Sequence, residues 1–201
     1  GDGVTVSAAG NAGAVKTART LQFSATVLDE GSSDGVPQGV TWEVTGNTSA
    51  STAIDTNGLL TVGADETVGG TLTVKATSVI NSAAVGTKTV TVEPLADTVT
   101  VSSAGNATGI RRGATLQFTA QVTGEGSTTG VSQGVTWSVS GNTSAGTAIN
   151  SNGLLTVGSD ETVGSALTVK AISTANSAVS GTNTVTVDLS EIANITPGST
   201  D

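Results

Sequence analysis

The chain of 201 residues contains no histidine, cysteine, tyrosine or methionine. Without histidine and cysteine, it cannot form an ordinary Ser-His-Asp or Cys-His nucleophilic site, nor a zinc site built on those ligands. Without cysteine there is also no disulfide, so the hydrophobic core alone must stabilise the fold, and cysteine usage gives no sign of the redox compartment. We therefore predict a protein that is not an enzyme and that uses no cofactor.

Long apolar runs and positive charge are also scarce. No run approaches the roughly 18–20 apolar residues that cross a bilayer, and neither an initiator methionine nor a signal-like segment is present, so we expect a processed product or a fragment. Acidic residues outnumber basic ones by 16 to 7, which gives a net charge of −9. Because such a surface repels phosphate backbones and anionic lipids, we expect no nucleic-acid partner and no membrane insertion.

The chain is a tandem repeat. A shift of 95 positions aligns Asp2–Pro94 with Asp97–Leu189 without a gap, with 61 identities in 93 positions. A long period with only two copies is typical of separate domains rather than of a solenoid of short repeats. We predict domain 1 at residues 1–94, domain 2 at 95–190, and an extended tail or the start of a linker at 191–201.

Within each copy, apolar and polar residues alternate over short segments, which is the pattern of half-buried strands. The polar positions are mainly Thr and Ser, and β-branched residues favour pleated sheets. In the first copy the apolar positions are Val4/Val6, Leu21/Phe23/Ala25/Val27, Val40/Trp42/Val44, Ile54, Leu60/Val62, Leu72/Val74/Ala76 and Val90/Val92. About seven strands per copy predict an all-β fold of two tandem immunoglobulin-like β-sandwich domains.

The residues around Asn57-Gly58 predict a particular hairpin. A two-residue turn would put Ile54 on the face opposite Leu60, whereas a three-residue loop at Thr56–Gly58 pairs the two and turns both inward. That loop needs a left-handed residue at its end, and glycine supplies one without steric cost. We predict this bulged hairpin, and the same one at Ser151–Gly153.

Five segments of each copy have the order and spacing of a known domain family. In the first copy they are Leu21–Val27 (LQFSATV), Val40–Gly46 (VTWEVTG), Ala53–Val62 (AIDTNGLLTV), Leu72–Ser78 (LTVKATS) and Thr89–Val92 (TVTV). With these segments the chain resembles the bacterial immunoglobulin-like domains of group 2, the BIG2 type. The resemblance implies a sandwich used in bacterial surface proteins and adhesins of the intimin and invasin kind, and in phage tail and capsid proteins. It implies no catalytic residue, and a shared fold does not by itself give function.

The four aromatic residues all fall at inward positions of predicted strands. They are Phe23, Trp42, Phe118 and Trp137. We predict that they belong to the cores, which leaves no aromatic face for stacking a sugar. A purely polar sugar site remains open.

Two acidic pairs are weak candidates for calcium ligands, Asp65 with Glu66 and Asp160 with Glu161. Their carboxylates could supply oxygen, and the pair recurs in the same glycine-bounded loop of each copy. A hard cation needs about six oxygen ligands, and no dense acidic loop surrounds either pair. The alternative is an ordinary solvated turn.

The two copies differ mainly in three segments, 13–19, 28–37 and 79–85 of the first copy. The first of these keeps basic residues in both copies: Lys16 and Arg19, then Arg111 and Arg112. The default explanation of such differences is sequence drift in solvent-exposed loops. If the protein has an interaction surface, these loops are where we expect it.

The linker and the tail carry two further expectations. The linker Glu93–Asp97 is short and contains a proline, which favours a restricted, rod-like arrangement. The tail contains Ile192 and Ile195. It is either a linker to a further domain or an arm whose isoleucines dock on a neighbouring subunit by strand addition, so self-association is one alternative.

These features together predict a non-enzymatic extracellular module of a bacterial surface protein. It would act in adhesion or as a rigid spacer, with a protein or a cell-surface polysaccharide as its target. The alternative is a structural subunit of an assembly, either a phage tail or capsid decoration in a virion or an extracellular filament. In that case the tail would contact a neighbouring subunit.

Overall fold

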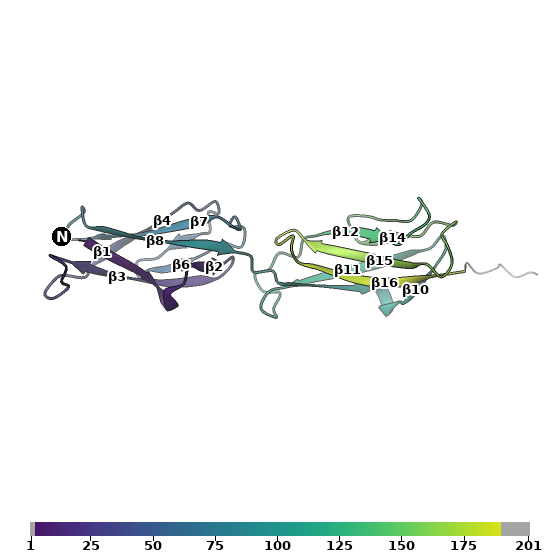
Figure 1. Cartoon of the computed structure of the whole chain (residues 1–201), viewed down its shortest axis with the longest axis horizontal. Coiled ribbons are helices and arrows are strands. Elements are labelled where there is room, and N and C mark those ends of the chain that lie inside the picture. Colours follow the sequence, from purple (N-terminus) through teal and green to yellow (C-terminus); the bar gives the residue numbers. More distant parts are fainter. Residues whose placement is uncertain (1–2, 190–201) are drawn as a thin grey trace, which may run out of the picture. The chain divides into compact units, whose positions relative to one another are not determined.

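A computed structural model describes residues 3–189, and nearly all of them lie in strands, turns and loops (Figure 1). The chain divides into two compact units, with the boundary between Leu95 and Ala96. We refer to the units as domain 1 and domain 2. Within the described residues, no helix is long and apolar enough to cross a membrane.

Domain 1 is a sandwich of two four-stranded sheets, with strand orders β1-β3-β6-β5 and β2-β8-β7-β4. Its strands are β1 (Gly3–Ala8), β2 (Ala14–Lys16), β3 (Thr20–Leu28), β4 (Val40–Thr45), β5 (Ala53–Ile54), β6 (Leu59–Thr61), β7 (Thr71–Ser78) and β8 (Val85–Glu93), with the short helix η1 (Ala9–Asn11) after β1.

Domain 2 repeats this arrangement, with strand orders β13-β14-β11-β9 and β10-β16-β15-β12. Its elements are β9 (Thr98–Ser103), η2 (Ala104–Asn106), β10 (Gly109–Arg111), β11 (Thr115–Thr123), β12 (Val135–Ser140), β13 (Ala148–Ile149), β14 (Leu154–Thr156), β15 (Ala166–Ser173) and β16 (Ser180–Asp188). The prediction of two tandem immunoglobulin-like β-sandwiches is therefore confirmed.

The core of domain 1 lies between its two sheets and uses the predicted alternation. Phe23, Leu60 and Val74 are almost completely buried, and Trp42 is partly buried against them. Domain 2 buries Phe118 in the same way. The aromatic residues thus pack into the sandwiches, as predicted.

The predicted hairpin is also confirmed, because Ile54 pairs with Leu60 across the loop. Gly58 has a φ of +79°. A Cβ there would stand 2.6 Å from the carbonyl oxygen of Phe23 and 3.0 Å from the Trp42 ring. Glycine is therefore required twice, for the backbone conformation and for the close approach. Domain 2 has the same register, with Ile149 opposite Leu155.

Each domain has an eighth strand that the sequence analysis missed. The chain first forms β1, which pairs antiparallel with β3. It then crosses to the other sheet, where β2 pairs in parallel with β8. The interpretation of residues 13–19 as an exposed loop was wrong, because Val15 is buried and opposite Val92. A strand with one apolar residue is too short to show alternation.

Strand β1 lies so close to β8 that only glycine fits at one position. A Cβ on Gly86 would stand 2.0 Å from the carbonyl oxygen of Val4. The backbone cannot yield there without separating β1 from β3, since Val4 is paired with Val27. Gly181 meets Val99 in the same way in domain 2.

We predict that Gly86→Ala destabilises domain 1 by about 1–3 kcal/mol, because overpacking against a fixed backbone forces local displacement. Urea unfolding followed by tryptophan fluorescence in a Trp137→Phe background would measure the effect, since Trp42 then reports on domain 1. Gly13→Ala is the control, because a Cβ at Gly13 meets nothing within 4 Å. Equal effects of the two substitutions would contradict the steric explanation.

Candidate functional site

The acidic pair Asp65-Glu66 lies in the loop between β6 and β7, against the loop between β4 and β5. Glu66 is only 5% exposed. Its Oε1 accepts hydrogen bonds from the N–H and the hydroxyl of Thr48, both at 2.7 Å. Its Oε2 accepts the Thr52 hydroxyl at 2.5 Å and the Ser49 N–H at 3.3 Å. The predicted solvated turn is therefore wrong for this glutamate.

Domain 2 repeats the arrangement atom for atom. Glu161 is fully buried and accepts hydrogen bonds from the N–H and hydroxyl of Thr143, the N–H of Ser144 and the hydroxyl of Thr147. Asp160 stays exposed, but its Oδ1 accepts the Ser144 hydroxyl at 2.5 Å. We call this carboxylate with its hydroxyl and amide donors the glutamate clamp.

The donors of the clamp hold the glutamates in the ionised form. Burial raises the pKa of Glu66, but the Thr52 hydroxyl and the N–H and hydroxyl of Thr48 together lower it by more, to about 2 from an ordinary value of 4.5. For Glu161, hydrogen bonds from the hydroxyls of Thr143 and Thr147 outweigh burial, and its pKa is also about 2. The clamp is therefore charged at neutral pH.

The clamp gives these carboxylates a structural role. Both oxygens of each glutamate already accept hydrogen bonds from the protein. Among residues 3–189, no three His, Cys, Asp or Glu side chains gather where they could hold a metal ion. Calcium binding at Asp65, Glu66, Asp160 and Glu161 stays a prediction, and the geometry favours the clamp.

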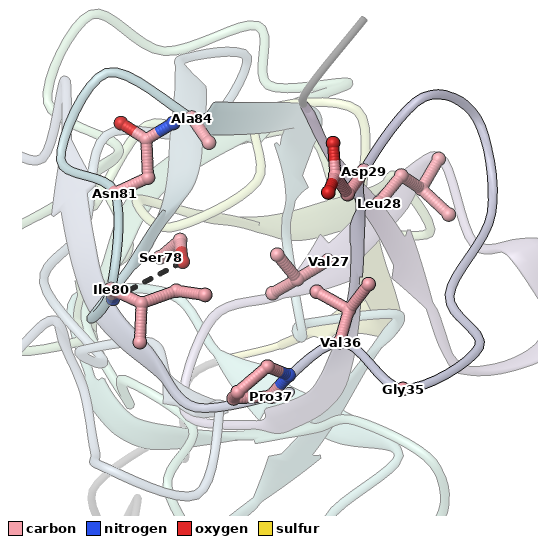
Figure 2. Close-up of a pocket in the computed structure, with 10 residues that line it drawn as sticks. All are labelled: Val27, Leu28, Asp29, Gly35, Val36, Pro37, Ser78, Ile80, Asn81 and Ala84. Atoms are coloured by element: carbon pink, nitrogen blue, oxygen red, sulfur yellow. Dashed lines mark hydrogen bonds between the residues drawn. The ribbon is translucent and has the colours of Figure 1, made fainter.

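Two of the three divergent segments meet at the opposite end of domain 1. The loop after β3 and the loop between β7 and β8 enclose a pocket of about 180 Å³ (Figure 2). Val27, Val36 and Pro37 form one wall, and Ile80 and Ala84 form the other. The lining comes from segments about fifty residues apart, so no local pattern could have revealed the pocket.

Two neighbouring apolar side chains, one of which lines the pocket, are exposed at this end of domain 1. Val79 is 61% exposed and Ile80 is 59% exposed. In domain 2 their counterparts are Thr174 and Ala175, and Ser132 replaces Pro37. The loop end of domain 1, by which we mean residues 27–37 and 78–84, is therefore the more apolar of the two.

The third divergent segment lies at the clamp end of the domain, away from the pocket. Lys16 is opposite Glu93 at the end of β8, and Arg19 donates from Nη1 to the carbonyl of Ala18. Arg111 lies in β10. The Nε of Arg112 is buried and has no hydrogen-bond partner among the described residues.

The structure does not unite the basic residues with the loop end, so their role as an interaction surface stays a prediction. Ile192 and Ile195, the other residues of the predicted interaction surface, lie outside the described residues.

A scan against protein-family models finds no match for the chain, and a search of curated protein sequences finds none either. Among solved structures, the adhesin InvE of Yersinia pseudotuberculosis is 18% identical with a TM-score of 0.46, over 92% of this chain and 58% of that one. The Escherichia coli adhesin FdeC is 19% identical with a TM-score of 0.40, over 92% and 64%.

Mouse cadherin-23 EC22-24 is 15% identical with a TM-score of 0.32, over 95% and 65%. The chain thus covers less than two thirds of each of these three structures. The fold class stands on the sheets described above, and membership of the group 2 family stays a prediction from sequence.

We predict that both domains lose stability as the pH falls from about 4.5 towards 2. The pKa of each clamp glutamate is lowered in the folded state, so its stabilising contribution is complete above the unfolded value of 4.5 and is lost as the pH falls through about 2. Thermal unfolding from pH 7 to pH 2 would measure the loss. The double substitution Glu66→Gln and Glu161→Gln should lower the melting temperature at pH 7 and flatten the acid dependence. Asp34→Asn, on an exposed residue of the loop after β3, should do neither.

We also predict that the melting temperature is the same in calcium chloride and in EDTA, because protein donors already occupy the clamp oxygens. Differential scanning calorimetry in both buffers would test this. A rise in melting temperature with calcium that Asp65→Asn and Asp160→Asn remove would support the metal site instead.

Proposed function

We propose that the chain is a non-enzymatic, extracellular immunoglobulin-like module of a bacterial surface protein, and that it acts in adhesion or as a rigid spacer. The observation that carries this proposal is that the two domains share their framework and differ in their loops. Both keep the same sheets and the same glutamate clamp. The exposed apolar residues Val79 and Ile80 occur beside the pocket at the loop end of domain 1 only.

A framework shared by both copies, with loops that differ between them, is the arrangement by which rigid scaffolds present binding residues. Exposed apolar side chains beside a pocket are typical of contacts with another protein. The bacterial exterior is supported by the resemblance to group 2 domains. The loop end therefore favours a protein target over a polysaccharide.

The second candidate is a structural subunit of an assembly, as a phage virion component or an extracellular filament. It is favoured by the exposed apolar residues of the loop end of domain 1, because a patch of this kind can be buried against a neighbouring subunit.

We predict that Val79→Asp weakens capture of a protein target by at least about tenfold, because a charge at the rim opposes burial of the apolar loop end. Biolayer interferometry of the full chain over immobilised extracellular-matrix proteins and polysaccharides would measure capture. Thr174→Asp makes the same change at the matching position of domain 2 and should leave binding unchanged. Chemical turnover of any immobilised target, or equal loss in both variants, would contradict the proposal. If the full chain captures none of the immobilised targets, the adhesive role is contradicted and the role as a rigid spacer remains.

A further inference from the structure

Domain 2 has one long edge strand that pairs on one side only. Strand β12 is the last strand of its sheet, and among the described residues it pairs with β15 alone. The other edge strands of the domain are short or covered. Strands β10 and β13 have three and two residues, and β9 lies against β16, where Asn183 donates from Nδ2 to the carbonyl of Val101 at 3.1 Å. A long strand with an open side is a template for adding another strand.

The hydrogen bonds of β15 show which main-chain groups of β12 point to the open side. The N–H of Ser173 donates to the carbonyl of Val179, on the β16 side, and the N–H of Thr174 donates to the carbonyl of Gly134, on the β12 side. Ser173 is opposite Val135, so this pair exchanges no hydrogen bond. Because bonded and non-bonded pairs alternate in an antiparallel ladder, the N–H and C=O of every second residue of β12 point away from β15. These residues are Val135, Trp137 and Val139.

The side chains of the same three residues are incompletely covered. They are partly buried, whereas Ala171 and Val169, which lie opposite Trp137 and Val139 on β15, are completely buried. A strand added beside β12 would therefore gain apolar burial as well as main-chain hydrogen bonds.

Strand β12 also lacks the charge that its counterpart in domain 1 carries. Edge strands usually avoid pairing with other chains through charged side chains or proline. In β4 the exposed Glu43 is such a residue, and its Oε2 lies 3.4 Å from Nζ of Lys75. Domain 2 has Ser138 at the matching position, and β12 contains no charged residue and no proline.

The sequence of β12 is self-complementary. Residues 135–139 have the order valine, hydroxyl, tryptophan, hydroxyl, valine in both directions. An antiparallel pair of two such strands, centred on Trp137, places each valine opposite a valine and each hydroxyl opposite a hydroxyl. Pairs of aromatic and of β-branched residues across strands are stabilising. The same pairing of two β4 strands would bring two Glu43 carboxylates to diagonal positions about 7–8 Å apart.

We propose that two copies of the chain associate through β12, which pairs antiparallel with β12 of the second copy and joins two four-stranded sheets into one. The contact contributes about six main-chain hydrogen bonds, two from each of three bonded pairs. Because it is isologous, it closes on a dimer. A contact between two single strands is smaller than a standard interface, so the dimer forms at high concentration. This inference goes beyond the proposed adhesive function and does not depend on the loop end of domain 1.

Sedimentation velocity of the full chain, from micromolar to millimolar concentration, tests the proposal. We expect an equilibrium of monomer and dimer. Ser138→Lys should weaken dimerisation by about tenfold or more, because each copy then brings a second ammonium group to the edge, next to Lys170 on β15. Thr182→Lys is the control. It adds the same charge next to the same Lys170, but on β16, and should leave dimerisation unchanged. Circular dichroism and melting temperature show whether each variant is folded.

Amide hydrogen exchange measured by NMR gives a second readout on the unmodified chain. The N–H groups that point to the open side of β12 should exchange more slowly as the concentration rises, because the second copy accepts their hydrogen bonds. The matching N–H groups of β4 should not change. They belong to Val40, Trp42 and Val44.

A chain that stays monomeric at millimolar concentration overturns the proposal. Equal losses in Ser138→Lys and Thr182→Lys would also overturn it, because net charge alone would then explain the effect. Species larger than a dimer would show that a different pair of surfaces associates. Ser138→Lys should leave the capture of a protein target unchanged, so failure of the dimer and failure of the proposed adhesive function are distinguishable.

Discussion

A buried, ionised glutamate at one end of each sandwich constrains the rest of the domain. A carboxylate removed from water is tolerated only if protein donors replace its hydration. Glu66 meets this condition with five hydrogen bonds from Thr48, Ser49, Thr52 and Thr67. The loss of one donor would leave the buried carboxylate less well solvated by the protein, so the residues of the two loops depend on one another. This explains why Thr48, Ser49, Thr52, Glu66 and Thr67 all recur in the second copy.

The clamp also limits variation in the two loops that form it. It joins the loop after β4 to the loop before β7, and so fixes the strand ends from which Val62 and Leu72 enter the core. The loops at the other end, after β3 and between β7 and β8, carry no such buried charge. Substitutions there change the surface without leaving a charge unpaired. Pro37 and Ile80 could therefore replace the smaller or more polar residues that the other copy has, and a pocket results.

Much of the fold could be predicted from the sequence, because it depends on local signals. The alternation of apolar residues, together with one glycine that can adopt a left-handed conformation, was enough to place Ile54 opposite Leu60. Strand β2 was not predicted, because its single buried residue, Val15, cannot show an alternation of apolar and polar residues. The burial of Glu66 was not predicted, because an acidic pair between glycines is ordinarily exposed to solvent. The available signal was that Thr48, Ser49 and Thr52 recur together with Glu66 in the second copy, which is compatible with a pairing of the two loops.

The two loop ends show how one framework can carry different surfaces. Both keep the same main-chain arrangement after the third long strand, with Asp29 bridged to Ser32 in domain 1 and Gly124 bridged to Ser127 in domain 2. In both, a glutamine side chain binds the same strand, Gln38 at Val27 and Gln133 at Val122. Pro37 and Ile80 line the pocket of domain 1 at positions where domain 2 has Ser132 and Ala175. Side chains there can change while the hydrogen-bonded main chain of the loops is kept, and this is how a rigid scaffold comes to present different surfaces.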